Sequence, residues 1–234
     1  MLILAFPMPS RSGISLSGTS GLIQIPTAEV IEDQQVAIGF GYVDRHAAYL
    51  ATHLFHNYPF FIVLGYLPRL EFSAGVTFVP GQQSYDGTNT YKDGVISLQY
   101  LVLKEHGQLP AIAIGVRDIY SFILLNTSYM VISKTIVNQP QSCWRLHIGY
   151  GSDLINRHLG VPKQDRDLPV GHTIVGLFGG LEISWKNWLI YLVEYDSQKI
   201  NAGFRFLFSQ HLNFMLVRMD MEYWSANLNW TFRL

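Results

Sequence analysis

The chain has 234 residues, of which charged residues make up 14% and aromatic residues another 14%, and its formal net charge is −1. Soluble domains usually carry roughly 25% charged residues, so an ordinary water-exposed surface is disfavoured. The balanced charge also excludes a global field that would attract nucleic acid. The longest apolar runs, such as 60–64, are far too short for a transmembrane helix of about 20 residues, but a closed β-barrel also satisfies its backbone within lipid.

Residues 1–34 are expected to stand apart from the rest of the chain. Met1 to Ala5 is apolar but lacks the basic and long apolar regions of a signal peptide, so it is interpreted as a signal remnant or a misplaced start. Pro26 interrupts strand pairing, so the segment around it is expected to plug the lumen or brace a rim rather than form an edge strand. The predicted organisation is an N-terminal segment, 1–34, followed by a barrel, 35–234.

From residue 35 onward, apolar and polar side chains alternate with a period of two, which indicates β-strands. The C-terminus is the clearest case, because Trp224, Leu228 and Trp230 share one face while Asn227 and Asn229 lie on the other. An even number of strands lets the first and last pair antiparallel and close the barrel. About twelve strands are expected, at 35–43, 59–67, 70–79, 94–103, 110–117, 122–134, 143–150, 174–184, 188–195, 200–208, 211–218 and 223–233.

The predicted connections favour an up-and-down barrel. The first, third and seventh are long, at 44–58, 80–93 and 151–173. Odd connections share one rim, and outer-membrane barrels have long loops outside and short turns in the periplasm, so both termini are expected to be periplasmic. The fifth, ninth and eleventh connections are short although they are odd. The tightest connections are the second, eighth and tenth, at 68–69, 186–187 and 209–210.

A soluble β-sandwich or lipocalin-like barrel would show the same alternation, with its aromatic face inside. Two features favour the membrane. Positions on the polar face are often Gly, Ser, Thr or Asn, with few Lys or Glu. Aromatic residues also cluster near predicted strand ends, as in interfacial girdles: Tyr42, Tyr66, Phe78, Tyr150, Tyr195, Trp224 and Phe232. The sequence therefore predicts an all-β, closed antiparallel up-and-down transmembrane barrel in a bacterial outer membrane.

Six charged residues from different predicted strands are assigned to the lumen. An arginine on the lipid face would cost about 2–4 kcal/mol near the midplane, so the lumen is the better location. Their mixed signs favour a salt-bridge network that fills and rigidifies the lumen; the alternatives are a polar path or glycan site, and a catalytic carboxylate pair, which requires a separation of about 5–9.5 Å. The six are Glu71, Arg117, Arg145, Glu182, Glu194 and Arg205.

No metal site, cofactor or catalytic residue is predicted. His46, His53 and His56 share a loop, but no HExxH motif or paired Cys/His spacing accompanies them. His147 beside a lumenal hydroxyl would resemble a hydrolase pair, but no serine stands in a recognisable nucleophile motif. The lone Cys143 is interpreted as an ordinary strand residue.

The stretch GTSGLIQIPTA at 18–28 resembles the opening motif G-x-x-G-L-I-x-x-P-[ST]-A of the YjbH-like (GfcD-like) family. Further matches follow in order: LPRLE at 67–71, GVRDI at 115–119, GGLE at 179–182 and EYD at 194–196. The resemblance covers most of the chain from about residue 18. Known members are bacterial outer-membrane β-barrels, often larger than this chain, associated with exopolysaccharide or capsule production and export. The resemblance singles out Gly21, Leu22, Pro26 and Thr27 as motif residues.

We therefore expect a non-enzymatic outer-membrane barrel that assists exopolysaccharide or capsule production or export. The alternatives are a structural or adhesive barrel whose outer loops bind partners, and a barrel enzyme acting on lipid or glycan. The expected partners are outer-membrane lipids, polysaccharide, other envelope export proteins and the barrel-assembly machinery. A lumen closed by the charged network would exclude a passive glycan conduit, and an enzyme would need a nucleophile and a base within hydrogen-bond reach.

Overall fold

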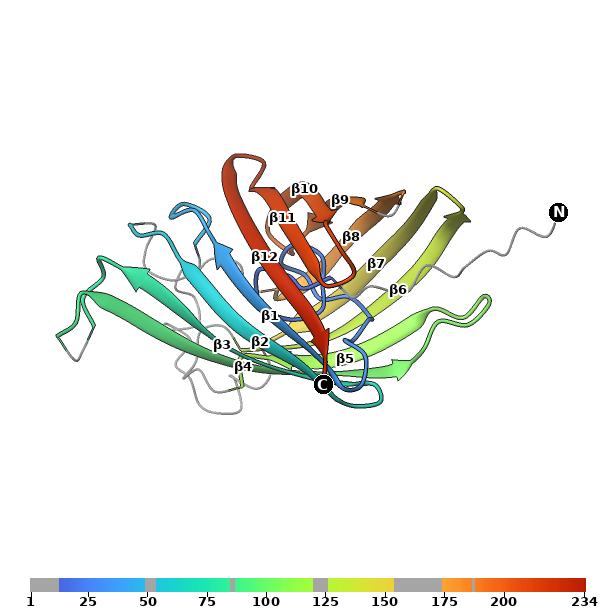
Figure 1. Ribbon diagram of the computed structural model, residues 1–234, viewed down its shortest axis with the longest axis horizontal. Helices are drawn as coiled ribbons and strands as arrows, with labels where there is room; N and C mark the ends of the chain where they lie inside the picture. Colours follow the sequence, from blue (N-terminus) through green and yellow to red (C-terminus); the bar gives the residue numbers. More distant parts are fainter. Residues whose placement is uncertain (1–12, 49–53, 85–86, 120–125, 154–173, 187) are drawn as a thin grey trace.

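A computed structural model of the chain describes residues 13–48, 54–84, 87–119, 126–153, 174–186 and 188–234. In this part of the chain, twelve antiparallel strands form one closed barrel (Figure 1). Each strand pairs with its neighbours in sequence, and β1 pairs with β12 along the register from Gln35↔Arg233 to Tyr42↔Ala226. The strands are β1 Gln35–Tyr42, β2 Tyr58–Leu67, β3 Leu70–Pro80, β4 Thr90–Leu103, β5 Ala111–Arg117, β6 Thr127–Gln139, β7 Ser142–Ser152, β8 Gly176–Trp185, β9 Leu189–Tyr195, β10 Ile200–Leu207, β11 Leu212–Met219 and β12 Tyr223–Arg233.

The predicted fold class is confirmed, with corrections at two strands. The sixth strand was expected at 122–134 but runs from Thr127 to Gln139, and 122–125 lie outside the described residues. The apolar residues before Thr127 misled the prediction, because β6 takes its register from β7, which it follows to the pair Gln139↔Ser142. The fourth strand begins at Thr90 rather than 94, because the β3–β4 hairpin stays paired to Pro80↔Thr90.

The two ends of the barrel differ in their connections. The end that holds Gln35 and Arg233, here called the terminal rim, also holds the short turns at 68–69 and 140–141. The opposite end, here called the loop rim, holds the strand ends that flank the long connections at 43–57 and 153–175. This is the predicted asymmetry. The described residues include no helix long and apolar enough to cross a membrane.

The two faces of the barrel wall have opposite chemistry. Large apolar side chains point outward, and Ile114, Ile148 and Leu228 are 47%, 50% and 46% exposed. Polar side chains of the same strands, such as Ser97 and Asn229, are buried inside. This orientation is the reverse of the one that a soluble barrel requires.

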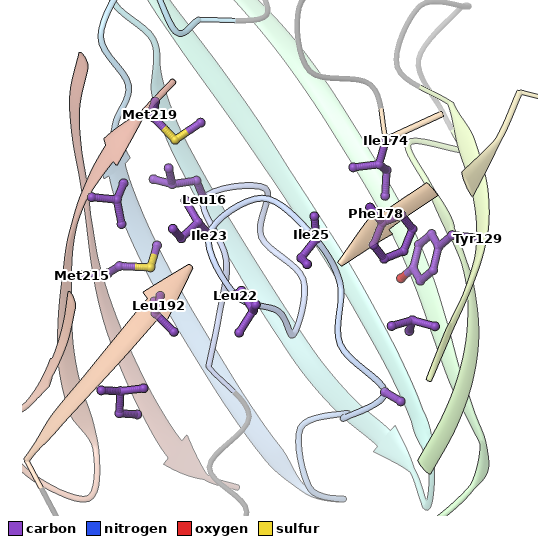
Figure 2. Close-up of a cluster of buried hydrophobic side chains, with 14 of the residues drawn as sticks. Leu16, Leu22, Ile23, Ile25, Tyr129, Ile174, Phe178, Leu192, Met215 and Met219 are labelled. Atoms are coloured by element: carbon purple, nitrogen blue, oxygen red, sulfur yellow. The ribbon is translucent and has the colours of Figure 1, made fainter. Parts of the chain in front are cut away.

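The barrel interior is filled by residues 13–34, here called the plug, which Figure 1 shows as a dark blue coil inside the strands. Its apolar residues Leu16, Leu22, Ile23 and Ile25 are completely buried. In Figure 2 they lie between Leu192, Met215 and Met219 on one side of the barrel and Tyr129, Ile174 and Phe178 on the other. The lumen therefore contains a hydrophobic core, not only polar groups.

Closure between β1 and β12 can be tested with cysteines. Ala37 and Thr231 are directly opposite each other in the register, so Ala37→Cys with Thr231→Cys, in a Cys143→Ser background, should form a disulfide in the folded protein. Gel mobility with and without reductant after denaturation measures the crosslink. Ala37→Cys with Thr135→Cys on β6, which does not neighbour β1, is the matched control and should stay uncrosslinked; equal crosslinking of both pairs would contradict the closed register.

Candidate functional site: the plug and its lumenal anchors

The plug folds on itself through tight backbone turns that require glycine. Gly18 has φ of 75°, in the left-handed region that glycine adopts without steric cost. At Gly21 a Cβ atom would lie 2.3 Å from the carbonyl oxygen of Ile25, and the Leu22 amide donates to that same carbonyl at 3.0 Å. The glycine spacing of the opening motif therefore has a local cause: the chain turns back on itself at both positions.

Glu194 of β9 binds one side of the plug. Its carboxylate accepts the backbone N–H groups of Ile23 at 2.9 Å, Gln24 at 2.9 Å and Ile25 at 3.2 Å. Asn201 of the neighbouring β10 donates to the same carboxylate at 3.0 Å. Successive amides that converge on one anion form a nest, and here the anion is supplied by the barrel wall.

Glu71 of β3 binds the plug in the same way. Its carboxylate accepts the Ser20 amide at 2.8 Å, the Ser20 hydroxyl at 2.5 Å and the Ile31 amide at 3.0 Å. Ser20 and Ile31 belong to two different stretches of the plug, so Glu71 joins them. Both Glu71 and Glu194 are 1% exposed, and their contacts with the plug are made away from bulk water.

Two arginines donate hydrogen bonds to backbone carbonyl groups of the plug. Arg205 of β10 donates from Nη2 to the carbonyls of Gly21 at 3.0 Å and Leu22 at 2.8 Å. Arg117 of β5 donates from Nη2 to the Gln24 carbonyl at 2.5 Å. Carboxylates therefore take the amides of the plug and guanidinium groups take its carbonyls, which satisfies a buried backbone that pairs with no strand.

The remaining two predicted charges have different roles. Arg145 of β7 forms an ion pair with Glu29 of the plug. Glu182 of β8 lies 3.9 Å from Nη1 of Arg205. The mixed signs of the six charges predicted a network in which they pair chiefly with one another, whereas five of the six contact the plug. The physical reason is that unpaired plug amides and carbonyls need partners more than the charges need each other.

Neutral residues outside the predicted set of lumenal charges also hold the plug. Gln99 donates from Nε2 to the carbonyls of Thr27, at 2.9 Å, and Glu29. Tyr129 donates to Gln99 Oε1 at 2.6 Å and so orients that amide. Asn227 donates to the Ser15 carbonyl at 3.1 Å. Strand alternation places all three inside the barrel, but nothing in their spacing marks them as ligands of a segment far away in the sequence.

A serine and a histidine also meet inside the barrel, so His147 does lie beside a lumenal hydroxyl, the arrangement that the sequence raised and disfavoured as a hydrolase pair. Ser133 Oγ lies 2.7 Å from Nδ1 of His147 and accepts the Ala28 amide of the plug at 2.8 Å. Both side chains are fully buried, and His147 Nε2 has no hydrogen-bond partner among the described residues. With Ser133 Oγ bound by the plug and no carboxylate orienting the imidazole, this geometry positions Ala28 and lacks the third member of a hydrolase triad.

The four motif residues lie in the plug. Arg205 binds the carbonyls of Gly21 and Leu22, and the Leu22 side chain packs against Gly180, where a Cβ atom would lie 2.4 Å from Leu22 Cδ1. Pro26 forms an isolated bridge with Gly21, and the Thr27 carbonyl accepts from Gln99. Three of the four motif residues thus contact the barrel wall directly, and Pro26 pairs with one of them.

The loop histidines are far less enclosed. His46 Nδ1 lies 2.9 Å from Asp44 Oδ1, and His56 Nδ1 lies 3.7 Å from Asp44 Oδ2. Partial burial acts to raise the pKa of Asp44, but hydrogen bonds from His46 and the nearby His56 outweigh it and hold the pKa below its usual value. Within the described residues no group of three His, Cys, Asp or Glu side chains is arranged to hold a metal ion; His53 lies outside them.

Comparison with known proteins identifies the family of the chain. The family model described as "Exopolysaccharide biosynthesis protein YbjH" matches residues 14–206, which include all of the plug except Gly13 and all six predicted lumenal charges. The chain belongs to this family. The resemblance found in the sequence is therefore confirmed.

Two individual proteins are also similar. The "Uncharacterized lipoprotein YjbH" of Escherichia coli (strain K12) is 28% identical over 134 residues, 55% of this chain, and the match covers 18% of that relative's length. The chain thus corresponds to a small part of this relative. Among solved structures, the "KdgM porin" aligns with a TM-score of 0.48 and 9% identity over 86% of this chain and 99% of that one.

Removing the Glu194 carboxylate should loosen the plug. Glu194→Ala leaves three buried amides without a partner, which costs about 3 kcal/mol or more and raises the population of undocked plug by on the order of a hundredfold. The rate at which a water-soluble maleimide labels Ile25→Cys, in a Cys143→Ser background, measures that population.

Glu222→Ala is the control, because Glu222 is exposed in the β11–β12 turn, and it should leave the labelling slow. Equal labelling rates in Glu194→Ala and in the parent, with the barrel still folded, would show that Glu194 does not hold the plug.

Proposed function

We propose that this chain is a plugged outer-membrane β-barrel that assists exopolysaccharide or capsule production or export without catalysing a reaction. The family description supports the process, and the barrel supports the location. The observation that carries the proposal is the filled lumen: Glu71 and Glu194 bind the backbone of the plug at five amides.

The outer surface of the barrel fits a lipid environment. Contiguous exposed apolar surface on a soluble monomer is unusual, whereas an apolar band is the defining surface of an outer-membrane barrel. Aromatic side chains border this band near the rims, with Tyr66, Tyr150 and Trp224 exposed by more than half, in the manner of an interfacial girdle. The hydrophobic side chains on the inner face of the barrel are buried against the plug.

The filled lumen argues against a permanently open glycan conduit. A chain of sugars cannot share the interior with the plug while Leu22, Ile23 and Ile25 occupy it. We therefore favour a role in which the barrel anchors or organises export components, or in which the plug is displaced when cargo or a partner protein arrives. Polysaccharide, other envelope export proteins and the barrel-assembly machinery are the partners that this role requires.

A structural or adhesive barrel is the second candidate, and one observation favours it: the strand ends that flank the two longest connections lie together on the loop rim. Its partners would then bind loops rather than the lumen. A barrel enzyme is disfavoured because the plug covers Ser133 and His147, and the Ser133 hydroxyl already binds the Ala28 amide.

Membrane location and function can be tested in the source bacterium. Unboiled and boiled gels of outer-membrane fractions should show a heat-modifiable band, because folded barrels resist detergent until they are heated. Deleting the gene should lower the amount of surface or secreted polysaccharide, and the intact gene should restore it. A soluble periplasmic product, or unchanged polysaccharide, would contradict the corresponding half of the proposal.

Plug closure can be tested separately in planar lipid bilayers. A Cβ atom at Gly65 would lie 1.9 Å from the carbonyl oxygen of Glu32, and all three of its nearest atoms belong to the plug. Gly65→Val should therefore push the plug out and produce channel openings where the parent protein shows almost none.

Gly94→Val is the matched control on β4, because a Cβ atom there meets nothing within 4 Å, and it should remain closed. Steady conductance by the parent protein would contradict the closed lumen. A folded Gly65→Val variant that stays closed would contradict the prediction that the fit of the plug at Gly65 keeps the lumen closed.

A further inference from the structure

Both ends of the plug lie at the terminal rim. Gly13 and Glu32 line one cavity there together with Arg233, at the end of β12. Ile14 and Ile31, the next residues inward from those two ends, are buried in one hydrophobic cluster. The plug is therefore a loop whose base lies at this rim.

The middle of the plug reaches toward the opposite rim. The Gln24 carbonyl accepts a hydrogen bond from Arg117, the last residue of β5. Glu194, the next to last residue of β9, accepts the amides of residues 23–25. Both strands end at the loop rim, so residues 23–25 form the tip of the loop.

The tether at the C-terminal end of the plug limits how the plug can leave. The plug continues directly into β1, where Gln35 pairs with Arg233 at the terminal rim. An extended chain spans at most about 3.6 Å per residue, so Glu29, six residues before Gln35, stays within about 22 Å of it. The apolar band of an outer-membrane barrel alone is about 25 Å tall. Movement through the loop rim would leave residues 29–34 in the lumen, whereas movement through the terminal rim would clear it.

The base of the plug also adjoins open space. A cavity of about 340 Å³ lies between the base and the wall formed by β9–β12 and β1. The tip, by contrast, is tightly enclosed, because Ile23 and Ile25 are completely buried. Close packing resists movement in a protein interior, so the base has more freedom to shift than the tip.

We propose that the plug opens the barrel by withdrawing through the terminal rim as one loop, and that whatever displaces it acts from that side. The route rests on the positions of the base, the tip and the tether. Its assignment to the periplasm rests on the proposed function, because the terminal rim is the predicted periplasmic side. Chain connectivity, rather than the strength of any one anchor, thus sets the direction of opening.

Side-specific labelling in whole cells tests this route. The full chain carries Ile25→Cys at the tip and Glu194→Ala to loosen it, in a Cys143→Ser background. The probe is a maleimide on a long poly(ethylene glycol) chain, which is too large to cross the outer membrane or to enter the lumen. Ile25→Cys should stay unlabelled on intact cells and become labelled once the outer membrane is permeabilised.

Two single-cysteine variants mark the two sides of the membrane, also in the Cys143→Ser background. Asn89 is exposed in the β3–β4 connection at the loop rim, and Gln210 is exposed in the β10–β11 turn at the terminal rim. Asn89→Cys should be labelled on intact cells, and Gln210→Cys only after permeabilisation. Without Glu194→Ala, Ile25→Cys should be labelled far more slowly in both samples.

Arg117→Gln is a second loosening variant, for use if Glu194→Ala fails to fold. It removes the hydrogen bonds of the guanidinium group to the Ser17 hydroxyl and the Gln24 carbonyl, and the same labelling pattern is expected. Labelling of Ile25→Cys on intact cells, or none after permeabilisation in a folded loosened variant, would overturn the proposal. Markers that fail to separate the two sides would instead contradict the membrane location on which the proposal rests, so the two failures are distinguishable.

Discussion

The structure depends on one constraint: a chain segment without a strand partner is buried inside a barrel, and its backbone must still be hydrogen-bonded. Each buried amide or carbonyl left without a partner costs about 1–3 kcal/mol. The barrel meets this need with charged side chains, so that Glu71 and Glu194 accept from plug amides while Arg117 and Arg205 donate to plug carbonyls. The lumenal charges therefore match the backbone groups of the plug, with carboxylates on its amides and guanidinium groups on its carbonyls.

Shape and hydrophobic packing act together with these hydrogen bonds. Gly65 and Gly180 leave room for plug atoms that any larger side chain would meet at less than 2.5 Å. Met215, Val217 and Met219 on β11 point inward and are completely buried. Each such side chain would lose about 1.5–3 kcal/mol if the plug left and water entered. The plug is thus held by polar and apolar contacts at once, and opening the lumen requires both to be broken or replaced by a partner.

Much of the fold could be predicted because strand alternation carries the information directly. A strand with one face in lipid and one in the lumen has a register that a single-residue slip would destroy, and this is why β12 was predicted so closely. The sixth strand was placed too early because the chain before Thr127 is also apolar, and only pairing with β7 locates its end at Gln139. Local pattern fixes which face a residue occupies better than it fixes where pairing starts.

The contacts of the plug could not be predicted in the same way. Alternation assigns Glu71, Glu194 and Gln99 to the interior, but their partners lie 40 to 171 positions away in the sequence. The 2.7 Å contact between Ser133 and His147 is likewise a consequence of β6–β7 pairing, which places the two residues opposite each other. Glycine spacing in the plug was visible and was attributed to a family motif, whereas its physical meaning, tight turns packed against the barrel wall, required the three-dimensional arrangement.

The most direct measurement is a disulfide between the plug and the barrel wall in the folded protein. Leu22 touches the position where Gly180 would carry a Cβ atom, so Leu22→Cys with Gly180→Cys, in a Cys143→Ser background, places two thiols within bonding range. A plugged barrel predicts rapid crosslinking in membranes, detected by mass spectrometry of the linked peptides. Free thiols at both positions in a folded, heat-modifiable barrel would show that the segment does not occupy the lumen.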